Sequence, residues 1–291
     1  MPLKVSIVTA SYNQAPYLEE TLKSVLGQAN VELEYLVLDG GSTDGSLDIL
    51  ERYKNRLAYY RTGPDEGQYY AIQEGFERST GDVMGWLNSD DKYLPGALSI
   101  VSEIFETFPD VEWITSMYPI IWDTRGRAIR CTYCKALSQK LFMRGASLSD
   151  GRWYSRNMMQ QESTFWRRSL WEKAGGSLQL SYALAGDFEL WLRFAKYASV
   201  HGVEVPLAGF RRHDEQKTGK YRAQYVEEAM RALEMHGAKP YGTVETALRK
   251  LLRNIEDFLP VRSFWSALDV LHASPSIRFD RGWQKKMRYM V

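Results

Sequence analysis

The chain has 291 residues, of which 44% are hydrophobic and 25% are charged, so it can bury the core of an ordinary globular protein. Its 37 Lys and Arg residues balance 36 Asp and Glu residues, and no overall field favours nucleic acid as a partner. No apolar stretch is long enough to span a bilayer and none near the start has the form of a signal peptide, so we expect a cytoplasmic protein.

Strand-like and helix-like segments alternate through the first part of the chain. Buried strands rich in β-branched and apolar residues are expected at residues 4–10, 33–38, 57–61 and 83–87. Apolar residues at helical spacing predict helices between and after them, at residues 18–26, 47–53, 68–78 and 98–105. This alternation with short loops predicts an α/β fold with a parallel, doubly wound sheet.

The pattern changes after residue 110. A strand at 113–117 and a hairpin of strands 120–122 and 128–133 predict antiparallel strands that join the sheet. The next expected elements are a strand at 163–166, helices at 169–174 and 187–198, and strands at 203–205 and 208–211. From residue 221 onward the pattern is helical. We therefore expect one α/β domain over residues 1–218 and a C-terminal helical region over residues 219–291.

Polar clusters follow three of the predicted parallel strands. They are residues 9–13 (TASYN), 39–42 (DGGS) and 88–91 (NSDD). Asn, Ser and Asp also favour simple turns, but the carboxyl ends of parallel strands share one sheet edge, where open α/β folds bind ligands. The chain has no G-x-G-x-x-G and no P-loop motif. A nucleotide bound here would need its phosphates neutralised by another group, such as a cation held by carboxylates.

Five sequence blocks, in this order and spacing, resemble the glycosyltransferases of family 2. They are TASYNQAPYLEETLKSVLGQ, EYLVLDGGSTDGS, DEGQYYAIQEGF, GDVMGWLNSDDKYLPGAL and DFELWLRFA. The resemblance covers residues 3–215 and implies the GT-A fold. It further implies a metal-dependent, inverting enzyme of the hexosyltransferase type that builds bacterial surface polysaccharide. The donor would be a nucleoside-diphosphate sugar, above all a UDP-sugar, and the acceptor a glycan or lipid-linked glycan.

The resemblance assigns a nucleotide-sugar site to the polar clusters. It implies that Tyr12 stacks on the base and that Asp39 accepts a hydrogen bond from the base imide. Asp39 could instead form an Asx-turn into the glycines that follow it. The residues implied to bind the nucleotide sugar are Thr9, Ser11, Tyr12, Asn13, Asp39, Ser42, Asp65, Gly67, Gln68, Asn88, Ser89 and Asp90.

The NSDD cluster occupies the place of the family's DxD motif. The resemblance implies that Asp90 and Asp91 hold Mg²⁺ or Mn²⁺ against the donor diphosphate, with His213 as a further ligand. Which of the two carboxylates contacts the metal is left open. Many relatives have Asp at the place of Asn88, whose amide can still bond a ribose hydroxyl.

Asp187, which directly precedes an apolar segment, matches the family's catalytic base. In inverting transferases such a carboxylate deprotonates the acceptor hydroxyl. At a helix N-terminus it could instead act only as a cap, and Glu189 is the alternative base. Many relatives have an acidic residue at the place of Gly186. By the same resemblance Gln161 and Glu162 line the acceptor pocket.

Two other function classes share parts of this pattern. A sugar-nucleotide pyrophosphorylase has a similar sheet, but it would carry a glycine-rich, basic loop after the first strand, and TASYNQ lacks one. A carbohydrate-binding relative without turnover is the second alternative. The intact Asp90, Asp91 and Asp187 argue against it.

Residues 250–291 contain eight Lys and Arg residues, four acids and several aromatic residues. This composition predicts either weak, peripheral contact with an anionic membrane surface or a helical cap on the catalytic domain, and both readings stay open. Cys131 and Cys134 form a C-x-x-C pair without a second pair or histidines at ligand spacing. We expect them to be reduced, structural thiols.

Overall fold

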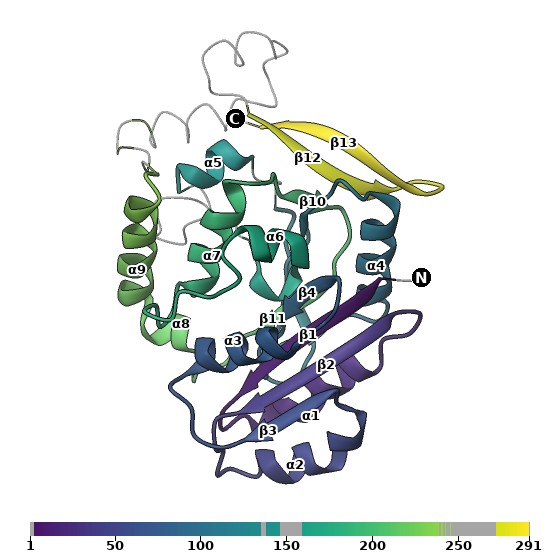
Figure 1. The fold of residues 1–291 in the computed structure, drawn as a ribbon, viewed down its shortest axis with the longest axis vertical. Coiled ribbons are helices and arrows are strands. Elements are labelled where there is room, and N and C mark those ends of the chain that lie inside the picture. The colour runs from purple at the N-terminus through teal and green to yellow at the C-terminus, as the bar shows by residue number, and fades with distance from the viewer. Residues whose placement is uncertain are drawn as a thin grey trace.

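A computed structural model describes residues 3–134, 138–145, 159–238, 240, 242, 245 and 272–290. Its main element is a nine-stranded sheet with the order β13-β12-β10-β6-β9-β4-β1-β2-β3 (Figure 1). In chain order these strands are β1 (Lys4–Ser11), β2 (Glu32–Asp39), β3 (Tyr59–Thr62), β4 (Val83–Trp86), β6 (Trp113–Ser116), β9 (Thr164–Arg167), β10 (His201–Val203), β12 (His272–Phe279) and β13 (Trp283–Met290).

Helices cover both faces of this sheet. They are α1 (Ala15–Leu26), α2 (Ser46–Tyr53), α3 (Gln68–Arg78), α4 (Ala97–Thr107), α5 (Gln139–Met143), α6 (Arg168–Lys173), α7 (Gly186–Ala195), α8 (Lys217–Lys220) and α9 (Arg222–Met235), with 3₁₀ turns η1 (Lys54–Arg56) and η3 (Gln161–Ser163). The expected alternation of strands and helices up to α4 is confirmed.

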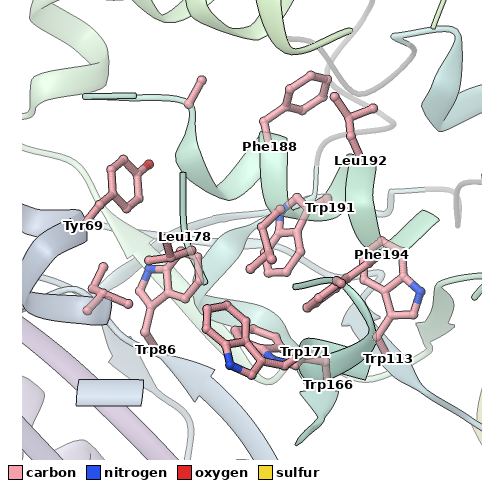
Figure 2. Close-up of a cluster of buried hydrophobic side chains, with 14 of the residues drawn as sticks. Tyr69, Trp86, Trp113, Trp166, Trp171, Leu178, Phe188, Trp191, Leu192 and Phe194 are labelled. Atoms are coloured by element: carbon pink, nitrogen blue, oxygen red, sulfur yellow. The ribbon is translucent and has the colours of Figure 1, made fainter. Parts of the chain in front are cut away.

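Two hydrophobic cores form because successive side chains of a strand point to opposite faces. Ile7 of β1 packs with α1, α2 and α4, whereas Val8 packs with α3, α6 and α7. The second core is rich in tryptophan, and Figure 2 shows Trp86, Trp166 and Trp191 at its centre. The rings of Trp86 and Trp191 stack with centroids 5.8 Å apart. This aromatic packing fixes α7 against the end of β4.

A second, four-stranded sheet has the order β5-β11-β7-β8. It consists of β5 (Lys92–Tyr93), β7 (Ile120–Trp122), β8 (Ala128–Cys131) and β11 (Ala208–Arg211). The predicted hairpin therefore exists as β7 and β8, but it does not join the main sheet, because β7 pairs with the distant β11 instead. Cys131 is exposed, Cys134 is buried and both are free thiols.

The expectation of helix throughout the C-terminal region is confirmed for α9 and wrong for residues 272–290. These residues form the antiparallel pair β12–β13, drawn in yellow in Figure 1. The turn that ends β12 has the residues Asp280-Arg281-Gly282, with φ of 57° at Arg281 and 150° at Gly282. Such Asp-x-Gly turns join hairpin strands, so a signal was present. The part of the expected helical region between residues 246 and 271 lies outside the described residues.

The order of the strands reverses beside β1. The chain runs from β1 to β2 and β3 on one side and then crosses to β4 on the other, always in parallel. The loops after β1 and β4 therefore diverge at one edge of the sheet, and such a point is where open α/β sheets bind ligands. The antiparallel β9 brings η3 to the same edge.

Candidate active site

Residues from earlier and from later in the sequence hold the NSDD turn after β4 by hydrogen bonds. Thr21 of α1 is buried, and its hydroxyl lies 2.9 Å from the carbonyl oxygen of Ser89 and 2.7 Å from that of Asp91. Within the turn, the Asp91 N–H donates to the Asn88 carbonyl at 3.1 Å. The cluster is thus a well-ordered turn, as its residue types favour, and this turn sets the direction of each side chain.

Arg211 at the end of β11 holds the turn in place, although it is not among the predicted site residues. Its side chain is fully buried. Its backbone N–H donates to the Asp91 carboxylate at 2.7 Å and its Nε donates to the Asp90 carbonyl at 2.6 Å. The Glu20 carboxylate neutralises the guanidinium at 2.5 Å. Arg211 precedes the predicted ligand His213 by only two residues, which is the one sequence signal for its role.

The two adjacent acids of the turn have different surroundings. Asp91 has no exposed surface, and burial, together with the charges of Asp90 and Glu162, raises its pKa well above the usual range. The side chain of Asp90 is 18% exposed, and its Oδ2 lies 2.8 Å from Nε2 of His213. The His213 ring in turn packs on Tyr17, with centroids 4.8 Å apart. The geometry therefore favours Asp90 over Asp91 as a ligand, although contact of either with a metal stays a prediction.

The Asp90 carboxylate offers oxygen ligands, which suit Mg²⁺ or Mn²⁺, and His213 adds one imidazole nitrogen, a ligand that a transition metal such as Mn²⁺ accepts better than Mg²⁺ does. Among the described residues, no three His, Cys, Asp or Glu side chains lie together as a metal-binding group. A cation held by this pair would complete its coordination with phosphate oxygens and water, as Mg²⁺ commonly does.

The loops after β1 and β2 form the other part of the site. Tyr12 is 62% exposed at the end of β1. A Cβ at Gly40 would lie 3.2 Å from Asp65 Oδ2 and 3.4 Å from the Tyr12 ring, so the loop after β3 also meets the loops after β1 and β2 at Gly40. Asn13, with φ of 52°, receives a hydrogen bond from the Thr43 N–H at 2.9 Å. The arrangement leaves an open aromatic face beside a carboxylate.

Asp39 has the Asx-turn geometry that the sequence left as an alternative. Its Oδ1 accepts hydrogen bonds from the N–H groups of Gly41 and Ser42 at 3.0 and 2.9 Å. The Ser42 hydroxyl donates to Oδ2 at 2.5 Å, and Thr62 donates to Oδ1 at 3.0 Å. Asp39 is fully buried. It builds the loop here, and a contact with a nucleotide base stays a prediction.

The remaining predicted nucleotide-sugar residues differ in their access to the site. Gln68 donates to Asn88 at 2.8 Å, and Asn88 donates to Asp91 at 3.3 Å, which links α3 to the turn after β4. The Gly67 N–H donates to Asp65 at 3.0 Å. Thr9, by contrast, is buried below the site and bonded to the Tyr35 hydroxyl at 3.0 Å.

Several buried oxygens at this edge have no hydrogen-bond partner among the described residues. They are Ser11 Oγ, Gln160 Oε1, Gln161 Oε1, Glu162 Oε1 and Ser163 Oγ. Gln161 is anchored through its Nε2, which donates to the Trp86 carbonyl at 2.6 Å. Burial raises the pKa of Glu162 to about 8, and the charges of Asp90 and Asp187 add to the shift. The Glu162 carboxyl therefore interacts electrostatically with both Asp90 and Asp187.

Asp187 is the second residue of α7, and its carboxylate caps the helix by accepting from the Phe188 N–H at 2.8 Å. Burial raises its pKa to about 6. The Tyr69 hydroxyl accepts from the N–H groups of Gly186 and Asp187 at 3.0 and 3.4 Å. A Cβ at Gly186 would lie only 2.8 Å from the Tyr69 ring. The acidic residue common in relatives would not fit at Gly186 with Tyr69 in this place.

Glu189, the alternative base, is occupied elsewhere. Its carboxylate pairs with Arg193 at 2.9 Å and lies 2.9 Å from His236 Nε2. Its side chain is buried, and Arg193 also donates to the Ala174 carbonyl at 2.6 Å. These contacts give Glu189 a role in joining α7 to its neighbours, and the geometry favours Asp187 as the base.

The model of the Glycosyl transferase family 2 matches residues 6–166, which is more than half of the chain. The chain belongs to this family. This glycosyltransferase has the GT-A fold. The NSDD turn and η3 lie within the residues that match the family model, whereas Asp187 and His213 lie beyond them.

Curated relatives of the glycosyltransferase come from several bacteria. An uncharacterized glycosyltransferase of Mycobacterium tuberculosis is 25% identical over 82% of this chain and 86% of its own length. An uncharacterized glycosyltransferase of Nostoc is 34% identical, but the match spans 36% of this chain and only 34% of that relative. TuaG of Bacillus subtilis, provisionally named for teichuronic acid biosynthesis, is 37% identical over 31% of this chain and 36% of its own length.

Solved structures share the fold at low sequence identity. S. aureus TarS 1–349 in complex with UDP-GlcNAc superposes with a TM-score of 0.62 and 16% identity, over 90% of this chain and 75% of that one. The mannosyltransferase PcManGT of Pyrobaculum calidifontis, in complex with GDP-Man and Mn²⁺, gives a TM-score of 0.56 and 16% identity over 93% and 73%. Within the described part of the glycosyltransferase, no helix is both long and apolar enough to cross a bilayer.

Proposed function

We propose that this glycosyltransferase moves a sugar, with inversion, from a nucleoside-diphosphate donor to a glycan or lipid-linked glycan in surface polysaccharide biosynthesis. The observation that carries the proposal is the approach of Asp90 to His213, 2.8 Å apart, at the edge where β1 and β4 diverge. Glu162, whose pKa responds to both Asp90 and Asp187, connects this pair electrostatically to the start of α7.

Asp90 and His213 are the residues that would hold a divalent cation. When bound, Mg²⁺ or Mn²⁺ would offset the negative charge that grows on the diphosphate as it departs. Arg211 keeps the Asp90 backbone in place for this purpose through the 2.6 Å hydrogen bond to its carbonyl. The complex of PcManGT with GDP-Man and Mn²⁺ makes the same pairing of nucleotide and metal reasonable for this chain.

The exposed Tyr12 ring would stack on the nucleotide base, and the loop built by Asp39 and Ser42 would surround it. Gln68 and Asn88, bonded to each other at 2.8 Å, would face the ribose hydroxyls. TarS was solved with UDP-GlcNAc, which supports a UDP-sugar as the first donor to test. The buried oxygens of Gln161 and Glu162 lack partners among the described residues and would accept hydrogen bonds from sugar hydroxyls.

Asp187 would act as the general base. Its carboxylate takes the proton from an acceptor hydroxyl while that oxygen forms a bond to the anomeric carbon of the donor sugar. The bond from this carbon to the diphosphate breaks on the opposite face, so the configuration inverts and the nucleoside diphosphate leaves with the electron pair. A pKa near 6 leaves Asp187 ionised at neutral pH and yet basic enough to accept a proton.

A thermal-shift screen with UDP, GDP and their sugars, each with Mn²⁺ or with a chelator, tests the donor class. A ligand that binds only the native state raises the melting temperature. Release of nucleoside diphosphate from the best donor then distinguishes an enzyme from a binding protein without turnover. Binding without any release, with or without candidate acceptors, would favour the non-catalytic alternative.

A further inference from the structure

The loop before α7 is tied to α9 by one carboxylate. Glu228 Oε2 accepts hydrogen bonds from the N–H groups of Ala183, Leu184 and Ala185, at 3.1, 2.8 and 3.0 Å. The Glu228 side chain is buried. Burial opposes its ionisation, but the hydrogen bonds from Leu184, Ala185, Gln224 and Ala183 together outweigh burial and lower its pKa. Glu228 is thus a buried anion seated on three backbone donors.

These contacts complete the hydrogen bonding at the start of α7. The first N–H groups of a helix lack partners within the helix. The Tyr69 hydroxyl accepts from the next two N–H groups, and Asp187 itself accepts from Phe188. Every backbone N–H from residue 183 to residue 188 therefore has an acceptor, and Glu228 supplies the first three. The position of Asp187 depends on these acceptors.

We propose that Glu228 is a positioning residue, which holds residues 183–185 against α9 and so places Asp187 at the reaction site. The inference rests on the proposed role of Asp187 as the base. It makes α9, which lies beyond the residues that match the family model, a working part of the active site.

Glu228 also influences the proton of Asp187. The titratable groups that interact with Asp187 are Tyr69 of α3, Glu162 of η3, and Tyr225 and Glu228 of α9. Burial raises the pKa of both tyrosines and of Glu162, so all three are neutral near pH 6. Glu228 stays ionised there because its own pKa is lowered, and its charge raises the pKa of Asp187.

The Glu228→Gln variant separates positioning from general packing, because glutamine keeps the size of the side chain and one acceptor oxygen but removes the charge. Glu227→Gln is the matched control. It removes the same charge from the same helix, but at an exposed position. The probe is the ¹³C carboxyl signal of Asp187 in protein labelled at aspartate, assigned with Asp187→Asn. This measurement needs no substrate.

We expect Asp187 to titrate near pH 6 in the wild type and in Glu227→Gln, and at lower pH in Glu228→Gln. With UDP-GlcNAc and Mn²⁺, we expect Glu228→Ala to lower kcat by about tenfold or more through misplacement of the base, with the donor KM unchanged. An Asp187 titration that does not move in Glu228→Gln, or that moves equally in Glu227→Gln, would overturn the proposal. The Asp187 titration in Glu228→Gln therefore tests the proposal even if Glu228→Ala does not fold. Normal transfer by Asp187→Asn would instead refute the base itself.

Discussion

The backbone N–H of Arg211 donates to the Asp91 carboxylate at 2.7 Å, across 120 residues of sequence. The same arginine donates from its side chain to the Asp90 carbonyl. One residue of β11 thus fixes both acids of the NSDD turn, and it leaves the Asp90 carboxylate free to face His213. We therefore expect the two adjacent aspartates to have separate roles, Asp91 in the fold and Asp90 at the site.

This division predicts opposite results for the two alanine variants. Asp91→Ala leaves the Arg211 N–H without its buried acceptor, so the free energy of unfolding should fall by about 1–3 kcal/mol. Asp90→Ala removes only a partly exposed side chain and should fold normally, but it should lose the extra thermal shift that Mn²⁺ gives a bound nucleotide. Urea denaturation and thermal shift measure the two effects. If Asp91→Ala is stable but lacks the Mn²⁺-dependent shift, the site role belongs to Asp91 and not to Asp90.

Asp187→Asn keeps the helix-capping oxygen and the size of the side chain, so it should fold and bind donor as the wild type does. Loss of the general base should lower the transfer rate by about 10²-fold or more. Rate and donor affinity are measured together. Glu189→Gln is the comparison, and near-normal transfer in Asp187→Asn with none in Glu189→Gln would show that Glu189 is the base.

The raised pKa of Asp187 predicts how rate and stability depend on pH. The base must be ionised, so kcat/KM should rise as the pH rises through about 6. The unfolded state has the lower, ordinary pKa, so the buried charge costs stability above pH 6, and this cost disappears as the pH falls toward 4. Asp187→Asn should therefore be more stable than the wild type at pH 8, by about 1–3 kcal/mol, and similar to it near pH 4. An equal difference at both values would contradict the assignment.

Gly186 lies so close to Tyr69 that we expect its replacement with alanine to lower stability, which is the opposite of the usual effect. Replacing a helical glycine with alanine ordinarily stabilises by roughly 0.5–1 kcal/mol. At Gly186 the new Cβ would lie 2.8 Å from the Tyr69 ring, so Gly186→Ala should destabilise by about 1–3 kcal/mol. Gly219→Ala in α8 is the control, because nothing lies within 4 Å of its Cβ position. A Gly186→Ala protein as stable as the wild type would show that Tyr69 moves freely.

The β12–β13 hairpin is the proposed place of membrane contact. Its Phe279 and Met287 side chains are 59% and 56% exposed on one face of the hairpin, and the exposed Lys286 lies on the opposite face of β13. Trp283 anchors the hairpin to α4 by donating to Glu103 at 3.1 Å. Each basic residue near an anionic surface contributes about 1 kcal/mol, and salt screens it. Phe279→Ser with Lys286→Glu should reduce sedimentation with phosphatidylserine vesicles at low salt.

The control for the hairpin is Tyr197→Ser, which removes an aromatic side chain that is 58% exposed elsewhere on the surface. Nucleotide affinity should be unchanged in both proteins, since the candidate donor-site residues are all outside the hairpin. Equal sedimentation of wild type and double variant, at low and high salt, would leave the hairpin as a packing element only.

Much of the fold and the location of the site could be predicted because they depend on local patterns. Alternating strands and helices up to residue 107 predict the sheet, and polar residues at the ends of β1, β2 and β4 predict which edge carries the candidate site. Asp90 and Asp187 were predicted from motifs on short segments. The predicted grouping of these residues at one edge follows from the parallel strand order.

Contacts between distant segments could not be read in the same way. Arg211, Glu228 and Tyr69 act through hydrogen bonds to backbone groups 43 to 121 residues away, and no periodicity marks them. The sequence predicts a helix in place of the β12–β13 hairpin because the basic and aromatic residues there resemble an amphipathic helix, although the Asp280–Gly282 turn is typical of a hairpin. Burial likewise decides that Thr9 lies below the site, which a polar residue at a strand end does not reveal.

The most direct test is the thermal shift of the wild type and Asp90→Ala with UDP, in Mn²⁺ and in chelator. The account predicts a larger shift with Mn²⁺ for the wild type, because the nucleotide and the cation bind the native state together at Asp90 and His213. Asp90→Ala should show the same small shift under both conditions. If no nucleoside diphosphate, whether UDP, GDP or another, gives a Mn²⁺-dependent shift in the wild type, the proposed metal-assisted donor site is wrong.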